Sequence, residues 1–213
     1  MKQKCLNRIK AAVRRTFAAA AVTVLSAAAA VTAFAGNVEG NVRSINGPVE
    51  FTQPEKGEWL FRDGRWYFRS AEGEVRGRWA CIEKQNGSRD WFCFDSGGAM
   101  CTGWQMSSGG NRYYLRETAD ERQGAMEKGF VLDAADGRCY YMDPSTGAMR
   151  TGWVSVEGNA YYFAEQGDRS AWYWDRDSSK WRSTGSGRPY GSMYRNETTP
   201  DGFMVDAGGR KVQ

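Results

Sequence analysis

The sequence contains no histidine among its 213 residues. Histidine has the side-chain pKa closest to neutrality, and Ser-His-Asp catalysis, Cys-His catalysis and His-ligated zinc hydrolysis all depend on it. Cysteine is also sparse, with five residues and no Cys-x-x-Cys pair, which disfavours a thiolate zinc site. The sequence therefore predicts a protein without enzyme activity, metal or cofactor.

Leucine and isoleucine are scarce, and the apolar residues are largely aromatic, with 9 Trp, 10 Tyr and 10 Phe. This composition is unlike that of a domain with one central aliphatic core. We expect the chain to build its core repeat by repeat, each unit burying its aromatic rings against the next.

The N-terminal apolar run, Ala18 to Ala30, is shorter than the roughly 20 residues that a membrane-spanning helix needs. Six basic residues precede it, and Ala33-Phe34-Ala35 fits a small-x-small cleavage site. Residues 1–35 therefore predict a cleaved export signal helix, which leaves a secreted protein without a membrane span. An uncleaved membrane anchor is the alternative.

Removal of the signal changes the charge of the chain, because all six of those basic residues and no acidic residue lie within it. Of the 29 basic residues 23 remain, against 25 acidic residues, so the formal charge of the mature chain is −2. Binding to a phosphate backbone depends on clustered Lys and Arg. The mature sequence therefore predicts no nucleic-acid partner.

A short phrase recurs five times between Trp59 and Phe163: an aromatic pair or triplet, a turn, Gly-small-Met or a variant of it, and Gly-x-Trp. Residues 91–104 are its clearest copy. The closing aromatic residues are separated by 20, 25, 26 and 23 positions, at Trp59, Trp79, Trp104, Phe130 and Trp153. A period of 20 to 50 residues is typical of repeat architectures.

Each copy has the pattern of a β-hairpin. In the clearest copy residues 91–94 alternate in the direction of their side chains, residues 95–98 supply a tight turn, and residues 99–102 return as the second strand. Single hairpins are marginally stable in water, so the units are expected to fold only when stacked. The predicted fold is all-β, a solenoid of stacked hairpin repeats. Its predicted organisation is signal 1–35, linker or lead-in 36–58, five repeats 59–163, and a variant repeat with a C-terminal cap 164–213.

Four cysteines remain after signal cleavage: Cys81, Cys93, Cys101 and Cys139. Cys93 and Cys101 fall opposite each other across the predicted turn, and an exported protein is permitted disulfides. The alternative is that all four replace buried apolar residues as small hydrophobic side chains.

The repeated phrase resembles the cell-wall-binding repeat, also called the choline-binding repeat, of Gram-positive surface proteins. That repeat reads approximately Gly-x-Trp-Tyr-Tyr-Phe, a turn, then Gly-x-Met-x-Thr-Gly-Trp. The resemblance covers residues 59–163, and residues 187–202 are similar to a closing segment that often follows such repeats. It implies a solenoid of β-hairpins with ligand cages between consecutive repeats, made by two Trp, a Tyr and a nearby Met. Ring faces hold a quaternary ammonium with about 0.5–2 kcal/mol per contact.

Carried over to this chain, the resemblance predicts one complete cage for choline or a glycan, formed by Trp91, Trp104 and Tyr114 with Met100 beside it. At the other interfaces Cys93, Arg112 or Cys139 replaces one ring. The weaker candidate site residues are Trp66, Trp79, Phe130, Tyr141, Trp153 and Tyr162. For all of these rings a core role is the alternative, and the Met residues are interpreted first as fillers between hairpins.

The predicted function is that of a secreted, noncatalytic protein, associated with the cell wall, that binds choline-bearing teichoic acid or another envelope glycan. The alternatives are a structural or adhesin-like repeat protein with a protein partner, and a glucan-binding module. The paired acids Asp175 and Asp177 are interpreted as a solvated loop, not as a glycosidase pair. The aromatic segment 172–181 is interpreted either as a row that stacks on sugars or as the core of a variant repeat. The sequence predicts no particular oligomeric state.

Overall fold

The computed structural model describes residues 47–48, 53–165, 172–175, 180–183 and 188–212, so the predicted signal helix and most of the predicted lead-in lie outside the described residues. Within these ranges no helix has the length and apolar character needed to cross a bilayer. The regular structure described there consists of β-strands.

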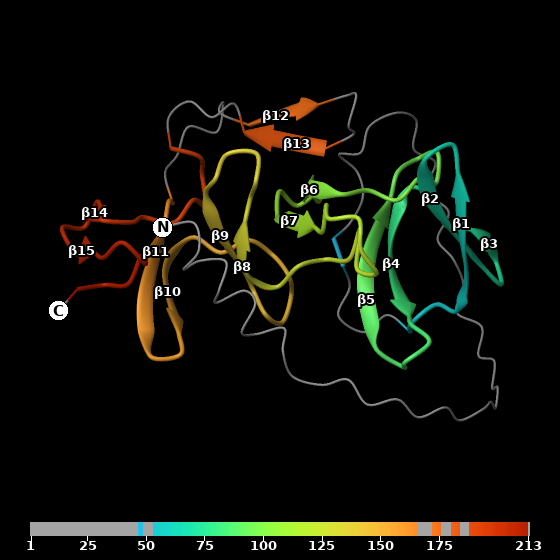
Figure 1. The fold of residues 1–213 in the computed structure, drawn as a ribbon, viewed down its shortest axis with the longest axis horizontal. Coiled ribbons are helices and arrows are strands. Elements are labelled where there is room, and N and C mark those ends of the chain that lie inside the picture. The colour runs from blue at the N-terminus through green and yellow to red at the C-terminus, as the bar shows by residue number, and fades with distance from the viewer. Residues whose placement is uncertain (1–46, 49–52, 166–171, 176–179, 184–187, 213) are drawn as a thin grey trace.

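Antiparallel hairpins follow one another along the long axis of the molecule (Figure 1). The predicted all-β series of hairpins is thereby confirmed. The five hairpins pair β1 (Gly57–Arg62) with β2 (Arg65–Ser70), β4 (Arg78–Glu83) with β5 (Arg89–Phe94), β6 (Gly103–Met106) with β7 (Arg112–Leu115), β8 (Gly129–Leu132) with β9 (Cys139–Met142), and β10 (Gly152–Val156) with β11 (Asn159–Phe163). Short strands flank them: β3 (Gly73–Glu74), β14 (Glu197–Thr198) and β15 (Met204–Val205).

The pairing within each hairpin differs from the predicted one. The turn at Asp95 forms, with the Asp95 N–H donating to the carbonyl of Ala99 at 2.9 Å. The return after it, however, is a single bridge between Phe94 and Met100 and not a strand over 99–102. The aromatic strand β5 instead pairs over its full length with β4, the strand that begins next to the preceding closing Trp. Six paired positions outweigh one bridge, so this ladder defines the hairpin.

Consecutive copies are joined by a recurring backbone hydrogen bond. The N–H of the Met in the Gly-small-Met segment donates to the carbonyl of the first residue of the aromatic triplet one copy earlier, at 2.7–2.8 Å. The pairs are Met100 with Trp66, Met126 with Trp91, Met149 with Arg112, and Met193 with Cys139. Each Met side chain also lies against the glycine that begins the same segment one copy later: Gly124, Gly147, Gly191 and Gly209. The interpretation of the Met side chains as fillers between hairpins agrees with these contacts.

The same contacts continue beyond residue 163. Phe163 bridges Met193, as Phe94 bridges Met100, so the fifth copy carries a long insertion in its sequence between these two residues. A sixth copy follows, in which Val205 bridges Lys211 and the Lys211 N–H donates to the carbonyl of Ala160 at 2.8 Å.

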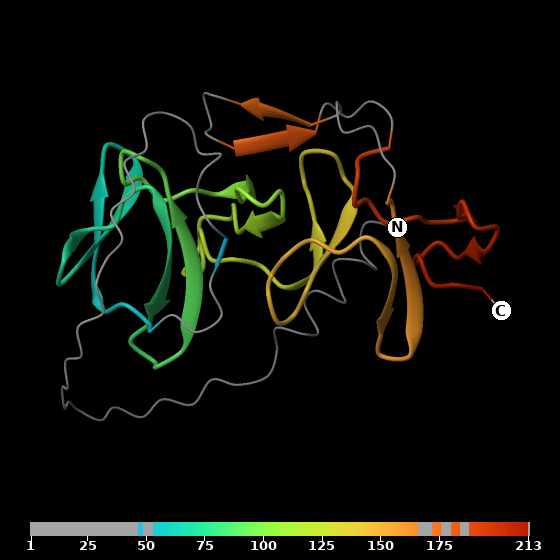
Figure 2. The same ribbon diagram turned by 180° about the vertical axis from the view of Figure 1, so that it is seen from behind.

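The insertion contributes a further hairpin, β12 (Trp172–Asp175) with β13 (Lys180–Ser183). Strand β13 pairs antiparallel with β6 at Trp181 and Trp104, which makes a four-stranded sheet in the order β12-β13-β6-β7. Figure 2 shows this hairpin beside the middle of the series. A segment of the fifth copy therefore contacts the third hairpin directly.

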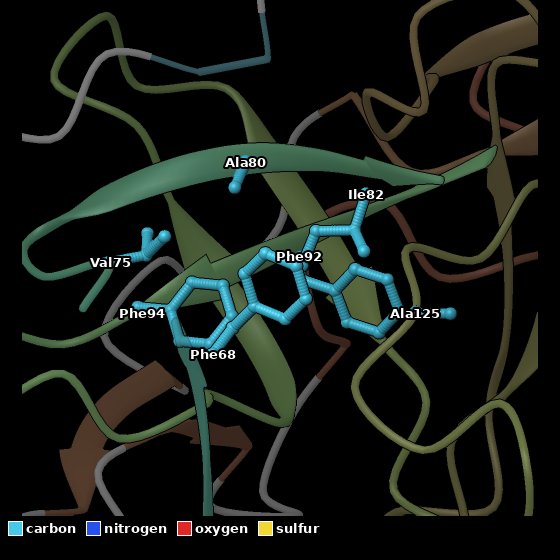
Figure 3. Close-up of a cluster of buried hydrophobic side chains, with 7 residues drawn as sticks. All are labelled: Phe68, Val75, Ala80, Ile82, Phe92, Phe94 and Ala125. Atoms are coloured by element: carbon cyan, nitrogen blue, oxygen red, sulfur yellow. The ribbon is translucent and has the colours of Figure 1, made fainter. Parts of the chain in front are cut away.

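The core is divided among the hairpins, as the composition predicts. One cluster fills the space between the first hairpins and is shown in Figure 3, where Phe68, Phe92 and Phe94 lie side by side near Ala80 and Ile82 of β4. Three further clusters follow along the chain, each centred on aromatic rings. No single aliphatic core is needed, because each interface between hairpins buries its own rings.

The four cysteines Cys81, Cys93, Cys101 and Cys139 are free and buried in the structure. Cys93 and Cys101 pack in one cluster, and their thiols interact. The hydrogen bond between the Cys93 and Cys101 thiols, together with burial, holds the pKa of Cys93 well above its usual value. The arrangement corresponds to cysteines acting as small apolar side chains. Within the described ranges no group of three or more acidic, Cys or His side chains is placed to hold a metal.

Candidate functional site

One contact between aromatic rings recurs at the hairpin interfaces. The aromatic residue that closes each copy of the phrase lies on the first strand of a hairpin. It packs against the third aromatic residue of that hairpin and against the second aromatic residue of the following hairpin. The complete sets are Trp59 with Phe68 and Phe92, Trp104 with Tyr114 and Tyr140, Phe130 with Tyr141 and Tyr161, and Trp153 with Tyr162 and Phe203. We call each of these a ring set.

The strand register produces the ring sets. In each hairpin the closing residue is directly opposite the third residue of the triplet, as Trp104 is opposite Tyr114. Their ring centroids are 5.0 Å apart at an interplanar angle of 71°, and Tyr140 lies 4.8 Å from Trp104 at 73°. Edge-to-face pairs of this kind are the arrangement that ring quadrupoles favour. At the second interface Cys93 stands opposite Trp79, so only Tyr113 contacts that ring, at 5.1 Å.

The structure brings together only part of the complete cage predicted from the sequence. Trp104 and Tyr114 are in contact, but Trp91 packs in the preceding cluster with Trp79, and Met100 packs against the first cluster. This grouping is corrected because β5 pairs with β4, which places Trp91 opposite Cys81, one hairpin away from Trp104. The ligand-binding role of these side chains stays a prediction.

The ring set around Trp104 is closed. Trp104 is 2% exposed and Tyr114 is 7% exposed. Their polar tips are occupied by carboxylates, since Trp104 Nε1 donates to Asp133 Oδ2 at 2.9 Å and the Tyr114 hydroxyl donates to Glu117 at 3.0 Å. Burial raises the pKa of Asp133, and the bond from Trp104 opposes that rise. These rings serve the core and present no open face.

Trp91, by contrast, is half-buried and lines a pocket of about 370 Å³. The pocket is otherwise lined by charged side chains and one methionine: Arg89, Asp90, Arg122, Met126, Glu127 and Lys128. Asp90 and Glu127 are each paired with a cation outside the lining, Lys84 at 2.5 Å and Arg116 at 2.9 Å, and with Arg122 of the lining at 3.9 and 3.6 Å. An accessible ring edged by charged side chains of both signs can stack on a sugar, whose hydroxyl groups the charged side chains can bind.

Trp66 is the most accessible of the predicted site residues. It is 37% exposed and lies beside two other exposed rings, Trp59 and Phe61, which are 36% and 59% exposed. The ring centroid of Trp66 is 6.3 Å from that of Trp59 and 4.8 Å from that of Phe61. We call these three side chains the end platform, because they lie on the hairpin at one end of the series (Figure 1). Trp59 also joins the first ring set, so the platform is continuous with the core.

The remaining predicted site residues divide between core and surface. Trp79 and Tyr141 are each 7% exposed, and Phe130 packs between Tyr141 and Tyr161 at 5.0 Å from each. Arg112 stands where two other copies have Trp66 and Trp91, and its guanidinium lies 5.0 Å from the ring centroid of Tyr190.

The ring set at Trp153 is open to solvent. Trp153 is half-buried and Phe203 is 43% exposed, and their centroids are 5.9 Å apart. Trp153 Nε1 donates to Asp201 Oδ2 at 2.7 Å. Tyr162 completes the set, and burial together with its bond to Glu165 raises its pKa to about 12. The ammonium of Lys211 lies over these rings, 3.2 Å from the centroid of Phe203 and 5.2 Å from that of Trp153.

Sequence reasoning missed the second aromatic residue of the triplet at every interface, and at the first interface it also missed Trp59 and Phe68. The second aromatic residues are Phe92, Tyr113, Tyr140, Tyr161 and Phe203. The signal was present, since the second position of every triplet between residues 91 and 162 is aromatic. Phe203 and Lys211 could not be assigned to a copy from the sequence, because the long insertion in the fifth copy interrupts the spacing by which a sixth copy would be detected.

Comparison with known proteins gives no matching protein-family model. The chain is 32% identical over 117 residues to glucosyltransferase-I of Streptococcus downei, a match that covers 54% of this chain and 7% of the glucosyltransferase. It is 28% identical over 109 residues to glucosyltransferase-S of the same organism, covering 51% of this chain and 7% of that protein. The chain therefore spans a small part of the length of each.

Solved structures similar to the chain include CbpJ from Streptococcus pneumoniae TIGR4, at 27% identity and a TM-score of 0.41 over 73% of this chain and 48% of that chain. The cell-wall endolysin from phage Cp-1 complexed with choline is 26% identical, with a TM-score of 0.44 over 78% and 40% of the two chains. The repeated phrase, its hairpin form and the sequence relatives agree. The repeats of this chain are similar to the cell-wall-binding repeats, also called choline-binding repeats, of such proteins, as the repeated phrase predicts.

Proposed function

We propose that the protein is a secreted, noncatalytic module, a solenoid of hairpins, that attaches to the bacterial envelope by binding choline-bearing teichoic acid or another wall glycan. The observation that carries this proposal is the end platform, where Trp59, Phe61 and Trp66 are each more than a third exposed. Contiguous exposed rings are costly in water and are typical of binding surfaces. Ring faces contact both quaternary ammonium groups and sugars.

The half-buried Trp91 supplies a second accessible ring on the neighbouring hairpin. Two modest sites on one rigid series of hairpins engage a polymeric ligand together, which raises the overall affinity above that of either site. A repeating wall polymer offers such a ligand.

A soluble α-glucan is the second candidate ligand. It is favoured by the likeness to two streptococcal glucosyltransferases, although the chain matches only 7% of each. The same rings would then stack on glucose units, and choline would not compete.

The test is retention of the purified protein on choline-containing cell walls, followed by elution with free choline, with α-glucan beads run in parallel. We expect retention on the walls, elution by choline, and no release of soluble wall fragments during incubation. Trp66→Ala should weaken retention by roughly 2- to 30-fold, the range for one lost ring contact. Tyr67→Ala is the matched control, because its side chain is on the opposite side of the same strand.

Three results are informative against the proposal. Binding to α-glucan that free choline does not compete with would show that the protein is a glucan-binding module. Release of soluble fragments overturns the noncatalytic assignment. If the folded protein binds no wall or glucan preparation, the envelope-binding function is wrong. The alternative is then a repeat protein that binds a protein partner.

A further inference from the structure

We infer that Lys211 is a tethered ligand: its ammonium fills the ring set of Trp153, Tyr162 and Phe203, so that this interface accepts no free organic cation while Lys211 is present. The ammonium lies 3.2 Å from the Phe203 centroid and 5.2 Å from the Trp153 centroid. Both distances are within the roughly 6 Å over which a ring face attracts a cation. The proposed function supplies the class of ligand that is displaced, a methylated ammonium.

The position of Lys211 in the repeat explains why the cation is there. Its N–H donates to the carbonyl of Ala160 and it bridges Val205, which are the two contacts that a Met makes in the preceding copies. In those copies the Met side chain lies against a glycine of the following copy, as Met193 lies against Gly209. Lys211 thus carries a charge at the Met position of the sixth copy, and its chain extends over the rings.

The surroundings of the ring set favour a positive charge. Asp201 accepts a hydrogen bond from Trp153 Nε1 at 2.7 Å and another from the Thr199 hydroxyl at 2.5 Å. These bonds, from Thr199 first and then Trp153, hold the pKa of Asp201 below its usual value, and the charge of Lys211 acts in the same direction. The carboxylate therefore remains charged near the rings, and it also fixes the orientation of the indole.

This ring set is accessible and its rings already carry a cation. The set around Trp104 is buried, whereas Phe203 is 43% exposed. An accessible set of three rings beside a carboxylate has the chemistry to bind a quaternary ammonium, and the ammonium of Lys211 already contacts two of these rings, Phe203 and Trp153. Lys211 is therefore a residue that determines specificity, because it removes one site from the number available to a free cation.

The experiment compares the full chain with its Lys211→Met variant, which restores the residue type of the other copies. Tetramethylammonium chloride is titrated while the indole N–H signal of Trp153, assigned with Trp153→Phe, is followed by NMR. We expect the Trp153 signal to shift with saturation in Lys211→Met, with an affinity at least about tenfold above that of the unchanged chain, the value of one displaced cation–π contact of roughly 1.4 kcal/mol. Lys211→Arg, which keeps the cation, should behave like the unchanged chain.

Two controls keep the result decisive. Phe203→Ala added to Lys211→Met should abolish the gained shift, and Lys211→Gln replaces Lys211→Met if the latter unfolds. Equal shifts of Trp153 in the unchanged chain and in both neutral variants, or no shift in any of them, would overturn the inference. Retention on walls is scored separately, so a chain that binds no wall but gains tetramethylammonium binding on loss of Lys211 defeats the proposed function and not this inference.

Discussion

Two tryptophans of equivalent position, Trp104 and Trp153, each donate an indole N–H to an aspartate, yet the two pairs differ in environment. Asp133, the partner of Trp104, is 2% exposed, whereas Asp201, the partner of Trp153, is exposed. A buried carboxylate has lost its hydration and depends on its hydrogen bonds, while an exposed one is solvated by water. The same contact is therefore structural in the first pair and orients an open ring in the second.

Trp104→Phe should lower the free energy of unfolding at pH 7 by about 1.5–3 kcal/mol through loss of the bond to Asp133, in addition to a packing loss that does not depend on pH. Burial already raises the folded-state pKa of Asp133 above 3.8. At pH values between the unfolded and the folded pKa, the folded chain therefore retains a proton on Asp133 that the unfolded chain has released. Stability attributable to this group is therefore greatest at low pH and falls as the pH rises through the folded pKa. Loss of the donor raises that pKa further, so the variant should lose more stability on going from pH 4 to pH 7 than the unchanged chain.

Urea unfolding between pH 4 and pH 7 measures this difference. Trp153→Phe is the matched control and should show a much smaller loss, because the carboxylate of Asp201 is solvated. If the deficit of Trp104→Phe is the same at both ends of the pH range, the Asp133 bond contributes nothing beyond packing.

At the scale of the element, each hairpin copy is joined to the next by a Met side chain lying against a glycine. Gly147 illustrates the requirement: its φ is 74°, and a Cβ built there overlaps the side chain of Met126. Gly137 has a similar φ of 66° but nothing within 4 Å of its Cβ position. Comparison of Gly147 with Gly137 therefore separates the free-energy cost of placing a side chain on left-handed backbone from the cost of overlapping a neighbouring side chain.

Gly147→Ala should destabilise the protein by about 1–3 kcal/mol more than Gly137→Ala, whose cost of about 1–2 kcal/mol is that of a left-handed backbone alone. Thermal or urea unfolding of the two variants gives the comparison. The additional cost of Gly147→Ala should shrink when Met126→Ala is introduced in the same chain, because the overlapping side chain is then absent. Equal losses for the two glycine variants would show that the Met contact is not tightly packed.

The hairpin elements could be predicted from the sequence, whereas their pairing could not. The aromatic triplet of β5 is flanked by two competent turns, one at Gly87 and one at Gly98, and both glycines have a positive φ. Turn chemistry alone does not choose between them. The pairing with β4 forms because the apolar residues of β4 pair with β5 over six positions. This pairing places Trp91 opposite Cys81 and not in the predicted cage with Trp104.

At the scale of the whole molecule, contacts run mainly between consecutive copies, which is the condition for quasi-one-dimensional stability. The insertion in the fifth copy departs from this pattern, because β13 pairs with β6 at Trp104. The repeated phrase predicts the series of hairpins, but nothing in its spacing predicts which earlier hairpin the insertion contacts. That contact is long-range in the sequence and leaves no periodic signal.

A series of this kind should transmit a local perturbation to its neighbours and little further. Leu115 and Val205 are both fully buried, the first in the middle of the series and the second in the sixth copy. Leu115→Ala, expected to cost roughly 2–5 kcal/mol, should speed amide hydrogen exchange in β4 to β9 on both sides of it. Val205→Ala should speed exchange in residues 193–212 and in β10–β11, and leave β4–β5 unchanged. Hydrogen exchange measured by mass spectrometry on the folded chain resolves these segments. Exchange that rises uniformly from β1 to β15 in both variants would show instead that the hairpins unfold as a single cooperative unit, and that the contacts between copies extend beyond nearest neighbours in their energetic effect.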